Sequence, residues 1–521
     1  MTSRLRTAAA TCGTGLTLSS LKIGLAGLTI LCSCGSVAAP PVTEPRWIGP
    51  VTVVDVLRGA LIPNIVLHIV DGKIVELVPS SALSATARAA LIAAPAPYAA
   101  PGLWDMHGAL TRYAPTLEHP AQLSFGVTRI RSIVSCPKEG VTNIHPCVAD
   151  VTRWNEAVRI CTLAGPLVMG TGTFPLNGPE HRHPDMPPSA ALRNEDDAKA
   201  FVREFKSLPV RPDHIKSYDG IPRASFFALL DEARTAGIEV SGHVPVAVPL
   251  TAAARAGMKA IAHARVLPIA CSDREDEIIG MRMNKVRRAE WMRRALETQD
   301  ATTCAKLWNT LREQGVYLSP TLITRYNETS AGLQALAADK DTMAMVPWIF
   351  ATMWQEDVDD ARARAVAEEH VYRDYYKLAG RLVAQAQAAG VTLLLGSDTF
   401  DTFVAPGVGL HQEMQLWRQA GIANADVLRA ATVNAARYFG LEATHGQVAA
   451  NQVADIVFVN DNPLASLSTL REPAGLMQAG RYYDRAALTQ VRQQAKDGAR
   501  SWRFTIKLLW DWAMSPLSFM K

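Results

Sequence analysis

Five side chains that can bind a metal ion or carry a proton follow short apolar runs in the sequence. They are His107, Lys216, His243, His263 and Asp398. Imidazole and carboxylate groups suit a borderline ion such as Zn2+, and a carboxylate can act as general acid and base. Each residue alone has a plain structural explanation; Asp398, for instance, could cap a helix. The order His, Lys, His, His, Asp after successive strands is harder to obtain by accident.

The runs that carry these residues are typical of short strands in a parallel sheet. Seven of them are FGVTRIRSIV, GPLVMGTG, DHIKSY, IEVSGHVP, KAIAHARV, GVYLSPTLIT and GVTLLLGSDT, and an eighth ends at His107. Amphipathic segments such as RASFFALLDEARTAG separate them. Repeated strand–helix units predict parallel pairing, and about eight of them predict a (β/α)8 TIM-like barrel. The carboxyl ends of all barrel strands meet at one face, where active sites form.

A small β-sandwich domain is predicted from both ends of the chain. Residues 46–80 alternate like strands, with Asp71-Gly72 as a hairpin turn, and a second β-rich patch lies at 452–464. The sequence predicts a signal peptide at 1–38, the two parts of the β domain at 39–99 and 441–484, the barrel at 100–440 and a Trp-rich helical tail at 485–521. Charged and helical stretches at 272–312 and 330–388 are expected to elaborate the barrel.

The N-terminus resembles a secretory signal, with Arg4 and Arg6 before a short apolar core. Cleavage after Ala38 and lipidation of Cys34 are both open, and so is an uncleaved anchor. Either processing event predicts an exported protein, periplasmic or lipid-anchored to the cell envelope. In an oxidising compartment, Cys136 with Cys147 and Cys271 with Cys304 could form disulfides or stay free thiols, because sequence does not fix pairing.

Composition argues for an ordinary globular protein and against a nucleic-acid partner. The 521 residues are 48% hydrophobic and 20% charged with a net charge of +4, and no basic tract alternates with aromatics. The C-terminal tail places Trp502, Trp510 and Trp512 among leucines and basic residues. A helix packed on the outside of the barrel is favoured for this tail over a membrane-surface contact or a protein contact. Oligomeric state is left open.

Several motifs together resemble the amidohydrolase superfamily over nearly the whole chain after the signal. APGLWDMH resembles the family's opening strand, GVTLLLGSDT its last barrel strand, and residues 409–464 its ending. DHIKSYDGIPRASFFALLDEARTAGIEVSGHVP is similar to the imidazolonepropionase-like and prolidase-like branch. The resemblance implies the barrel fold; the substrate has to be argued from the site, because one fold hosts many reactions.

The resemblance also implies roles for the five residues. Lys216 would be carboxylated by CO2 and bridge two metal ions. His243 and His263 would hold one ion with that bridge, and His107 and Asp398 would hold the other. The ions, Zn2+ or another divalent metal, would acidify a water and polarise the scissile carbonyl. Asp398 would accept the water's proton and pass it to the leaving nitrogen.

Three positions depart from the family pattern. The first strand usually ends in His-x-His, but Ala109 follows His107 at the second position. Ala262 stands before His263 and Ser132 ends the second strand, where acidic residues are expected. One ion therefore loses a ligand, while Lys216, His243 and His263 predict one strong site, since three protein ligands suffice for a catalytic zinc.

A ligand from a loop could complete the weakened position. The HRH segment at 181–183 is a candidate, although a solvated loop is the favoured interpretation.

These residues are compatible with three functions. The first is a metal-dependent hydrolase that cleaves a C–N bond of a small amide, a dipeptide or a cyclic amide. The second, motivated by Ala109 and Ala262, is a catalytically impaired binding protein of the cell envelope. A sugar deacetylase or lactonase on the same scaffold is the third.

Overall fold

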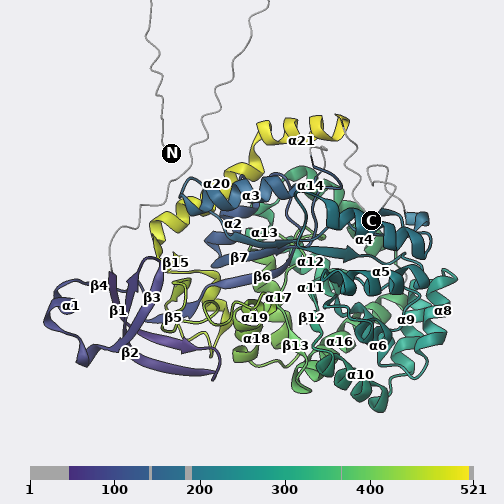
Figure 1. Ribbon diagram of the computed structural model, residues 1–521, viewed down its shortest axis with the longest axis horizontal. Helices are drawn as coiled ribbons and strands as arrows, with labels where there is room; N and C mark the ends of the chain where they lie inside the picture. The colour runs from purple at the N-terminus through teal and green to yellow at the C-terminus, as the bar shows by residue number, and fades with distance from the viewer. Residues whose placement is uncertain (1–45, 140–143, 182–189, 365, 515–521) are drawn as a thin grey trace, which may run out of the picture. The chain divides into compact units, whose positions relative to one another are not determined.

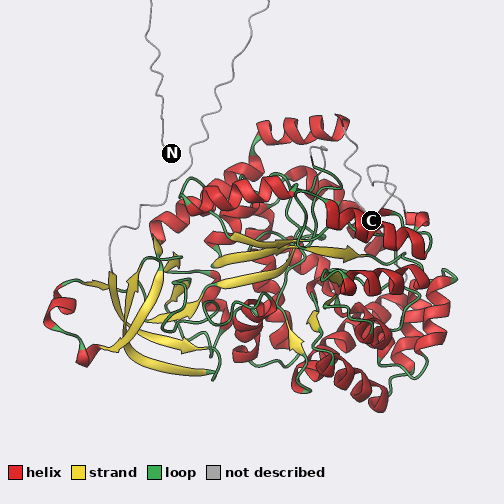
Figure 2. Ribbon diagram, viewed as in Figure 1, coloured by secondary structure: helices red, strands yellow, loops and turns green. Residues whose placement is uncertain are grey.

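The protein has an α/β fold with parallel sheets, as the sequence predicts (Figure 2). The computed structural model describes residues 46–139, 144–181, 190–364 and 366–514. The predicted signal at 1–38, with Cys34, lies outside these residues. In the described part, three sheets account for the named strands, two of them parallel throughout.

An antiparallel ribbon opens the described chain. Its strands are β1 (Arg46–Asp55), β2 (Ala60–Val70) and β3 (Lys73–Pro79). Asp71 and Gly72 join β2 to β3 with φ of 49° and 76°. A two-residue hairpin turn of type I′ needs positive φ at both positions, which Asp-Gly tolerates well. The predicted hairpin is confirmed.

Both ends of the chain build the first sheet. Its remaining strands are β4 (Leu91–Ala93), β5 (Tyr98–Pro101), β14 (Ile456–Val459), β15 (Gly475–Gln478) and β16 (Arg481–Asp484). Strand β5 pairs with β1 on one side and with β14 on the other. Ile48, Leu67 and Phe458 share one buried cluster. The eight strands form one sheet in the order β16-β15-β14-β5-β1-β2-β3, with β4 beside β1, so strands from both ends of the chain share it.

Eight parallel strands carry the predicted site residues. The first sheet of these holds β6 (Leu103–Gly108), β7 (Val127–Ser132) and β8 (Leu167–Thr171). The second holds β9 (His214–Ser217), β10 (Glu239–Gly242), β11 (Ala260–Ala262), β12 (Tyr317–Ser319) and β13 (Thr392–Leu393). All eight coincide with runs identified in the sequence.

Two isolated bridges join these sheets at both edges. Gly172 pairs in parallel with His214, which links β8 to β9, and Gly108 pairs in parallel with Thr399, which links β6 to the segment after β13. Each strand therefore has a neighbour on both sides, in sequence order. That cyclic order is the one a (β/α)8 barrel requires, and it brings the residues after the strands toward one another.

Helices separate the strands (Figure 1). In the first half they are α1 (Ala85–Ala89), α2 (Glu118–Ser124), α3 (Val148–Arg159), α4 (Glu195–Ser207), α5 (Arg223–Thr235), α6 (Leu250–Arg255), α7 (Leu267–Ala270), α8 (Glu275–Met283) and α9 (Arg288–Glu297). In the second half they are α10 (Ala301–Glu313), α11 (Ile323–Tyr326), α12 (Ser330–Ala338), α13 (Lys340–Met345), α14 (Trp348–Met353), α15 (Gln355–Ala363), α16 (Val366–Ala388), α17 (Val408–Gln419), α18 (Asn424–Ala430) and α19 (Val433–Tyr438).

Helix α5 shows why these segments pack as they do. Its buried residues Phe226, Leu229, Leu230 and Ala233 recur at the spacing that places them on one helix face. The charged residues of the same segment stay toward solvent. This pattern lets the helix cover a sheet with one apolar face.

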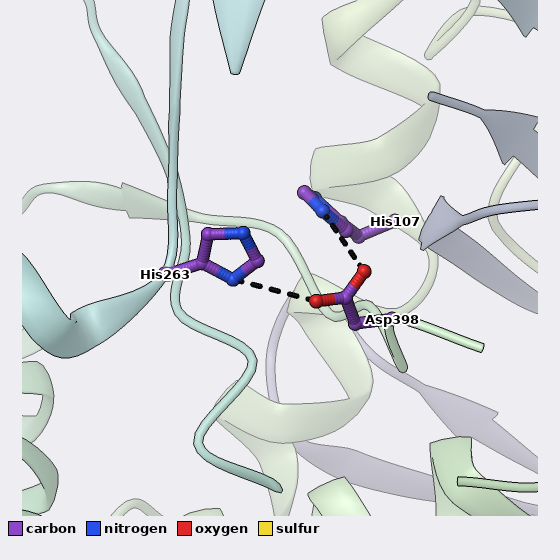
Figure 3. Close-up of side chains that lie close together, drawn as sticks. All are labelled: His107, His263 and Asp398. Carbon is purple, nitrogen blue, oxygen red and sulfur yellow. Dashed lines mark ion pairs between the residues drawn. The ribbon is translucent and has the colours of Figure 1, made fainter. Parts of the chain in front are cut away.

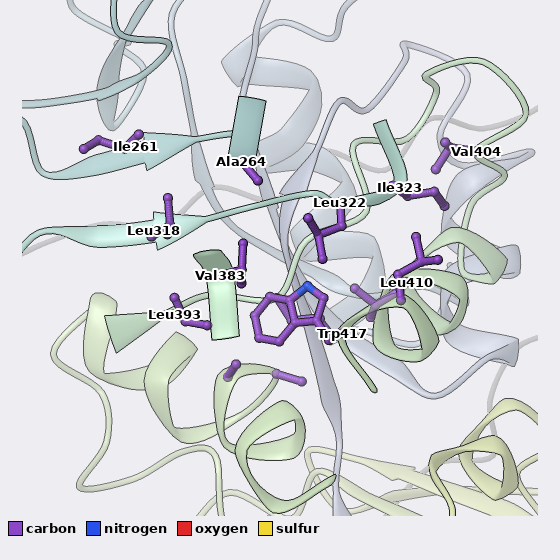
Figure 4. Packing of buried hydrophobic residues seen from close by; sticks show 14 of the residues in the cluster. Ile261, Ala264, Leu318, Leu322, Ile323, Val383, Leu393, Val404, Leu410 and Trp417 are labelled. Carbon is purple, nitrogen blue, oxygen red and sulfur yellow. The ribbon is translucent and has the colours of Figure 1, made fainter. Parts of the chain in front are cut away.

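Trp417 on α17 stands in the main hydrophobic cluster (Figure 4). It is fully buried, and its Nε1 donates to Glu413 at 2.6 Å. Glu413 also accepts from the backbone N–H groups of Leu322 and Ile323, each at 2.7 Å. A buried carboxylate is tolerated when donors satisfy it. Glu413 thereby ties α17 to the segment that follows β12.

The structure contains both disulfides that the sequence left open. Cys136 is bonded to Cys147 and Cys271 to Cys304. The first closes the loop before α3, and the second ties the segment after α7 to α10. Cys161 is a free thiol.

Two helices close the described chain, α20 (Arg485–Arg500) and α21 (Trp502–Met514). Leu488 and Val491 of α20 are buried, and Arg492 donates to the carbonyl of Ser124 in α2 at 3.0 Å. Helix α20 therefore packs against α2. Among the described residues, no helix combines the length and apolarity needed to cross a membrane.

The disulfide between Cys271 and Cys304 yields a stability prediction. The two residues are 33 apart in sequence, and closing such a loop restricts the unfolded chain by about 3–4 kcal/mol. We expect the double variant Cys271→Ser/Cys304→Ser to lose that much free energy of unfolding in a urea titration. Cys161→Ser is the matched control and should keep the parent midpoint. An unchanged midpoint in the double variant would contradict the prediction.

Candidate active site

His107 is positioned by contacts between the first and last parallel strands. Asp105 is fully buried and accepts from the backbone N–H of His107 at 3.1 Å. It also accepts from the N–H and Oγ of Ser397 at 3.0 and 2.5 Å. A Cβ at Gly396 would lie 2.4 Å from the His107 Cβ. Glycine at 396 therefore allows β6 to approach the segment after β13, which brings His107 to Asp398.

His107, His263 and Asp398 form one cluster (Figure 3). His107 Nε2 lies 3.4 Å from Asp398 Oδ1, and His263 Nδ1 lies 3.6 Å from Asp398 Oδ2. One ligand atom from each residue falls within 4.8 Å of the others. His107 Nε2 is buried and makes no hydrogen bond within the described chain. An orphaned imidazole nitrogen beside a carboxylate is a donor set that fits a divalent ion.

The backbone around this cluster is strained. His263, Thr321 and Asp398 have φ of 68°, 39° and 59°, in the left-handed region that non-glycine residues rarely adopt. Thr321 Oγ1 lies 2.7 Å from His263 Nδ1. Such conformations cost of order 1–3 kcal/mol each and concentrate at functional sites. Three of them in contact indicate that the surrounding fold fixes these side chains.

His243 stands beside the cluster and is held by its own polar neighbours. Its Nε2 lies 2.8 Å from His263 Nε2. On the other side of the ring, Nδ1 lies 2.8 Å from Arg265 and 3.3 Å from Asp219. Arg265 donates to both Asp219 oxygens at 2.7 and 2.6 Å, and the Tyr218 ring stacks on His243 at 4.1 Å. The Arg265 and Asp219 groups thus set the orientation of His243.

Sequence reasoning missed Asp219 and Arg265. Their only signal is their spacing, three residues after Lys216 and two after His263. The Arg265 guanidinium and His243 hold the pKa of Asp219 below its usual range despite burial. An ionised carboxylate beside a histidine that faces a metal site is a common way of fixing the imidazole.

Lys216 is buried in β9 and lines a small cavity with His107 and Arg131. Burial lowers the pKa of its amine, against the opposing effect of the Asp398 carboxylate. Burial and the nearby Asp401 raise the pKa of Asp398. Each group therefore favours the charged form of the other, whereas burial disfavours both charges.

The structure places all five predicted residues at the carboxyl ends of the parallel strands, or just after them. It groups them differently from the sequence, which assigned His263 with Lys216 and His243, and His107 with Asp398. In the structure His263 lies within reach of both sets. Of the HRH segment at 181–183, His181 ends a short 3-10 helix (Pro179–His181), whereas its side chain and residues 182–183 lie outside the described residues.

The three residues that depart from the family pattern, Ala109, Ser132 and Ala262, supply no metal ligand. The backbone N–H of Ala109 donates to the carbonyl of Thr399 at 2.8 Å, and its methyl group offers no ligand. Ser132 donates to the carbonyl of Val134 at 3.0 Å. Ala262 lines the cavity beside Lys216. None of the three side chains supplies a carboxylate or imidazole to the cluster.

Comparison with known proteins gives the family. Residues 228–482 match the model of the Amidohydrolase family, a range that includes His243, His263 and Asp398. No curated protein matches the chain in sequence. Together with the fold, the family match shows that the chain belongs to the amidohydrolase superfamily.

Solved structures of the same fold are similar over most of the chain. A bottromycin amidohydrolase shares 23% identity at a TM-score of 0.62, covering 87% of this chain and 90% of its own. A Xaa-Pro dipeptidase with bound methionine shares 16% at 0.57, covering 85% and 100%. Molinate hydrolase shares 17% at 0.56, covering 86% and 96%. At these identities the likeness shows the fold alone.

The role of Asp219 and Arg265 in orienting His243 can be tested by measuring metal affinity. We expect Asp219→Asn to weaken Zn2+ binding about ten- to hundredfold, because His243 loses the charged group that orients it. Calorimetric titration of metal-free protein with Zn2+ measures this. Asp197→Asn is the matched control, since Asp197 pairs with Arg193 at 2.8 Å on the surface. Equal dissociation constants for the two variants would argue against an orienting role.

Proposed function

We propose that this protein is a metal-dependent amidohydrolase that uses a metal-activated water to hydrolyse a C–N bond in an amide, a dipeptide or a cyclic amide. The observation that carries the proposal is the cluster of His107, His263 and Asp398 beyond the parallel strands. Its location in an amidohydrolase-family chain supports the reaction type. The names of similar structures, an amidohydrolase and a Xaa-Pro dipeptidase, support amides and dipeptides as the substrate class.

We assign the ion to His107, His263 and Asp398, with carboxylated Lys216 and His243 lining the neighbouring position. Zn2+ or another divalent ion suits these ligands. The sequence predicts that Ala109 weakens the position of His107 and Asp398, but His263 joins these two residues in one cluster. We therefore propose one strongly held ion at this cluster and a weak or vacant second position beside Lys216 and His243. Such an ion supplies an acidified water and polarisation of the scissile carbonyl.

Residues of the chain would then transfer the proton from the attacking water to the leaving nitrogen. The Asp398 side chain is 19% exposed, so water can reach it although the histidines around it are buried. Asp398 accepts the proton of the attacking water and delivers it to the leaving nitrogen. Thr321 and Arg265, through their contacts with His263 and His243, keep the imidazoles in place while the proton moves.

The surrounding architecture is proposed to follow the family. The cyclic order of β6 to β13 supports a (β/α)8 barrel over 100–440, with a sandwich-like β domain from 39–99 and 441–484. The two disulfides support export from the cytoplasm, because such bonds persist in oxidising compartments. We retain residues 1–38 as a signal peptide and the cell envelope as the location.

Metal analysis with activity assays tests the proposed function. We expect about one equivalent of tightly bound Zn2+ in the parent. The variant His263→Ala should hold less than about half an equivalent, because it removes the ligand that faces both Asp398 and His243. Asp398→Asn should lower kcat on dipeptides or N-acyl amino acids by about 10²- to 10⁴-fold, since the amide cannot accept the proton.

His68→Gln is the control, because His68 lies on β2 and pairs with Glu76 at 3.1 Å; it should keep both metal and activity. A metal-replete parent that holds less than about half an equivalent would count against the proposal.

Ala109 is the specific observation that favours a second candidate, an impaired binding protein of the envelope. The variant Ala109→His separates the two. If it raises both bound metal and amidase activity from near zero, the parent has lost catalysis and the second candidate holds. If the parent already hydrolyses amides and the variant changes little, the second candidate fails. Lactones and N-acetylated sugars in the same assay panel test the remaining alternative.

A further inference from the structure

Helix α21 is attached to the protein by one face. Phe504 and Leu508 are buried, and the Phe504 ring packs edge-on against Tyr113 at 5.0 Å. The Tyr113 hydroxyl donates to Asp511 at 2.6 Å. Lys507 reaches the same carboxylate at 2.8 Å. These contacts fix the rotation of the helix about its axis, and therefore fix which residues face outward.

The outward face carries a stripe of large apolar side chains. Trp502, Ile506, Leu509 and Trp510 are 67%, 56%, 40% and 64% exposed. Their spacing of i, i+4, i+7 and i+8 places them side by side on one helix face. Scattered exposed apolar residues are ordinary on protein surfaces, and interaction sites are found where such residues are contiguous. The side chain of Trp512 lies outside the described residues.

The exposed charged side chains of α21 itself are basic. Arg500, Arg503 and Lys507 are exposed on α21 or just before it, and Arg503 lies over the Trp502 ring at 5.6 Å. The sole acidic residue of α21 is Asp511, which is buried against Tyr113. Within the described part of α21 the exposed charged side chains are therefore cationic, with Lys507 paired to Asp511, and the exposed acidic residue that comes before them is Asp497 in α20.

We propose that the stripe on α21 binds the surface of an anionic lipid bilayer, with the helix lying in the plane of the interface. Indole rings prefer the boundary between headgroups and acyl chains, and basic residues at the edge of an apolar face attract anionic headgroups. The helix has 13 residues, too few to cross a bilayer. Its place at the margin of the protein is visible in Figure 1.

The size of the stripe argues against a second protein copy as the occupant. A 13-residue helix is about 20 Å long and about 10 Å across, so one face offers on the order of 200 Å². A stable protein–protein interface needs about 800 Å² from each partner. A bilayer accepts a narrow stripe because the apolar contact and the headgroup attraction act together without shape complementarity.

Vesicle binding of the full chain tests the proposal. We expect the parent to sediment with vesicles of phosphatidylcholine and phosphatidylglycerol, and Trp502→Ser/Trp510→Ser to bind them at least about tenfold more weakly. Arg503→Gln should weaken binding about fivefold on the anionic vesicles and leave binding to pure phosphatidylcholine unchanged. Bromine-labelled lipids should quench parent tryptophan fluorescence more than that of the double variant.

Ile92→Ser/Met283→Ser is the matched control, because Ile92 and Met283 are 46% and 58% exposed on β4 and at the end of α8. It should bind and be quenched like the parent. The N-terminal segment is identical in every variant, so quenching that is equal in parent and Trp variant overturns the proposal even if the chain is anchored elsewhere. Self-association that depends on Trp502 and Trp510, without vesicle binding, also overturns it.

Discussion

The contact between the first and last parallel strands is the constraint on which the site depends. Asp398 donates its backbone N–H to the carbonyl of His107 at 2.7 Å, and Asp105 binds Ser397 through both carboxylate oxygens. Burial raises the pKa of Asp105, and the donors around it oppose that shift. Leaving such a group without its partners costs about 1–3 kcal/mol or more. The same bonds that join the strand ends therefore place the His107 imidazole at the Asp398 carboxylate.

The positions of the five residues after the strands could be predicted from the sequence, because parallel strands place the residues that follow them at the same end of the sheet. Once His107, Lys216, His243, His263 and Asp398 each follow a strand, the topology brings them to one end of the sheet whatever the intervening helices do. The hairpin at Asp71-Gly72 was equally local, since two adjacent residues carry the whole signal. Short-range chemistry and strand order together account for what was predicted correctly.

Other features were beyond sequence reasoning because they depend on distances between distant segments. The pairing of Cys271 with Cys304 depends on how the segment after α7 packs against α10. The Arg265 contact with Asp219 joins two segments 46 positions apart, and nothing in the sequence runs that contain these residues indicates that they pair. The grouping of His263 with His107 and Asp398 depends on a positive φ at His263, which a sequence containing histidine there gives no reason to expect.

These observations change the meaning of Ala109. As a gap in a His-x-His pattern, it predicts one weak or vacant metal position and one strong position built on Lys216, His243 and His263. In the structure His263 also faces Asp398, so His107 has two partners even though residue 109 offers none. Three protein ligands are enough for a catalytic zinc with an open position for water. The strained backbone at His263 and Asp398 is a cost that a merely structural barrel would have little reason to retain, which favours catalysis over a barrel kept only as a scaffold.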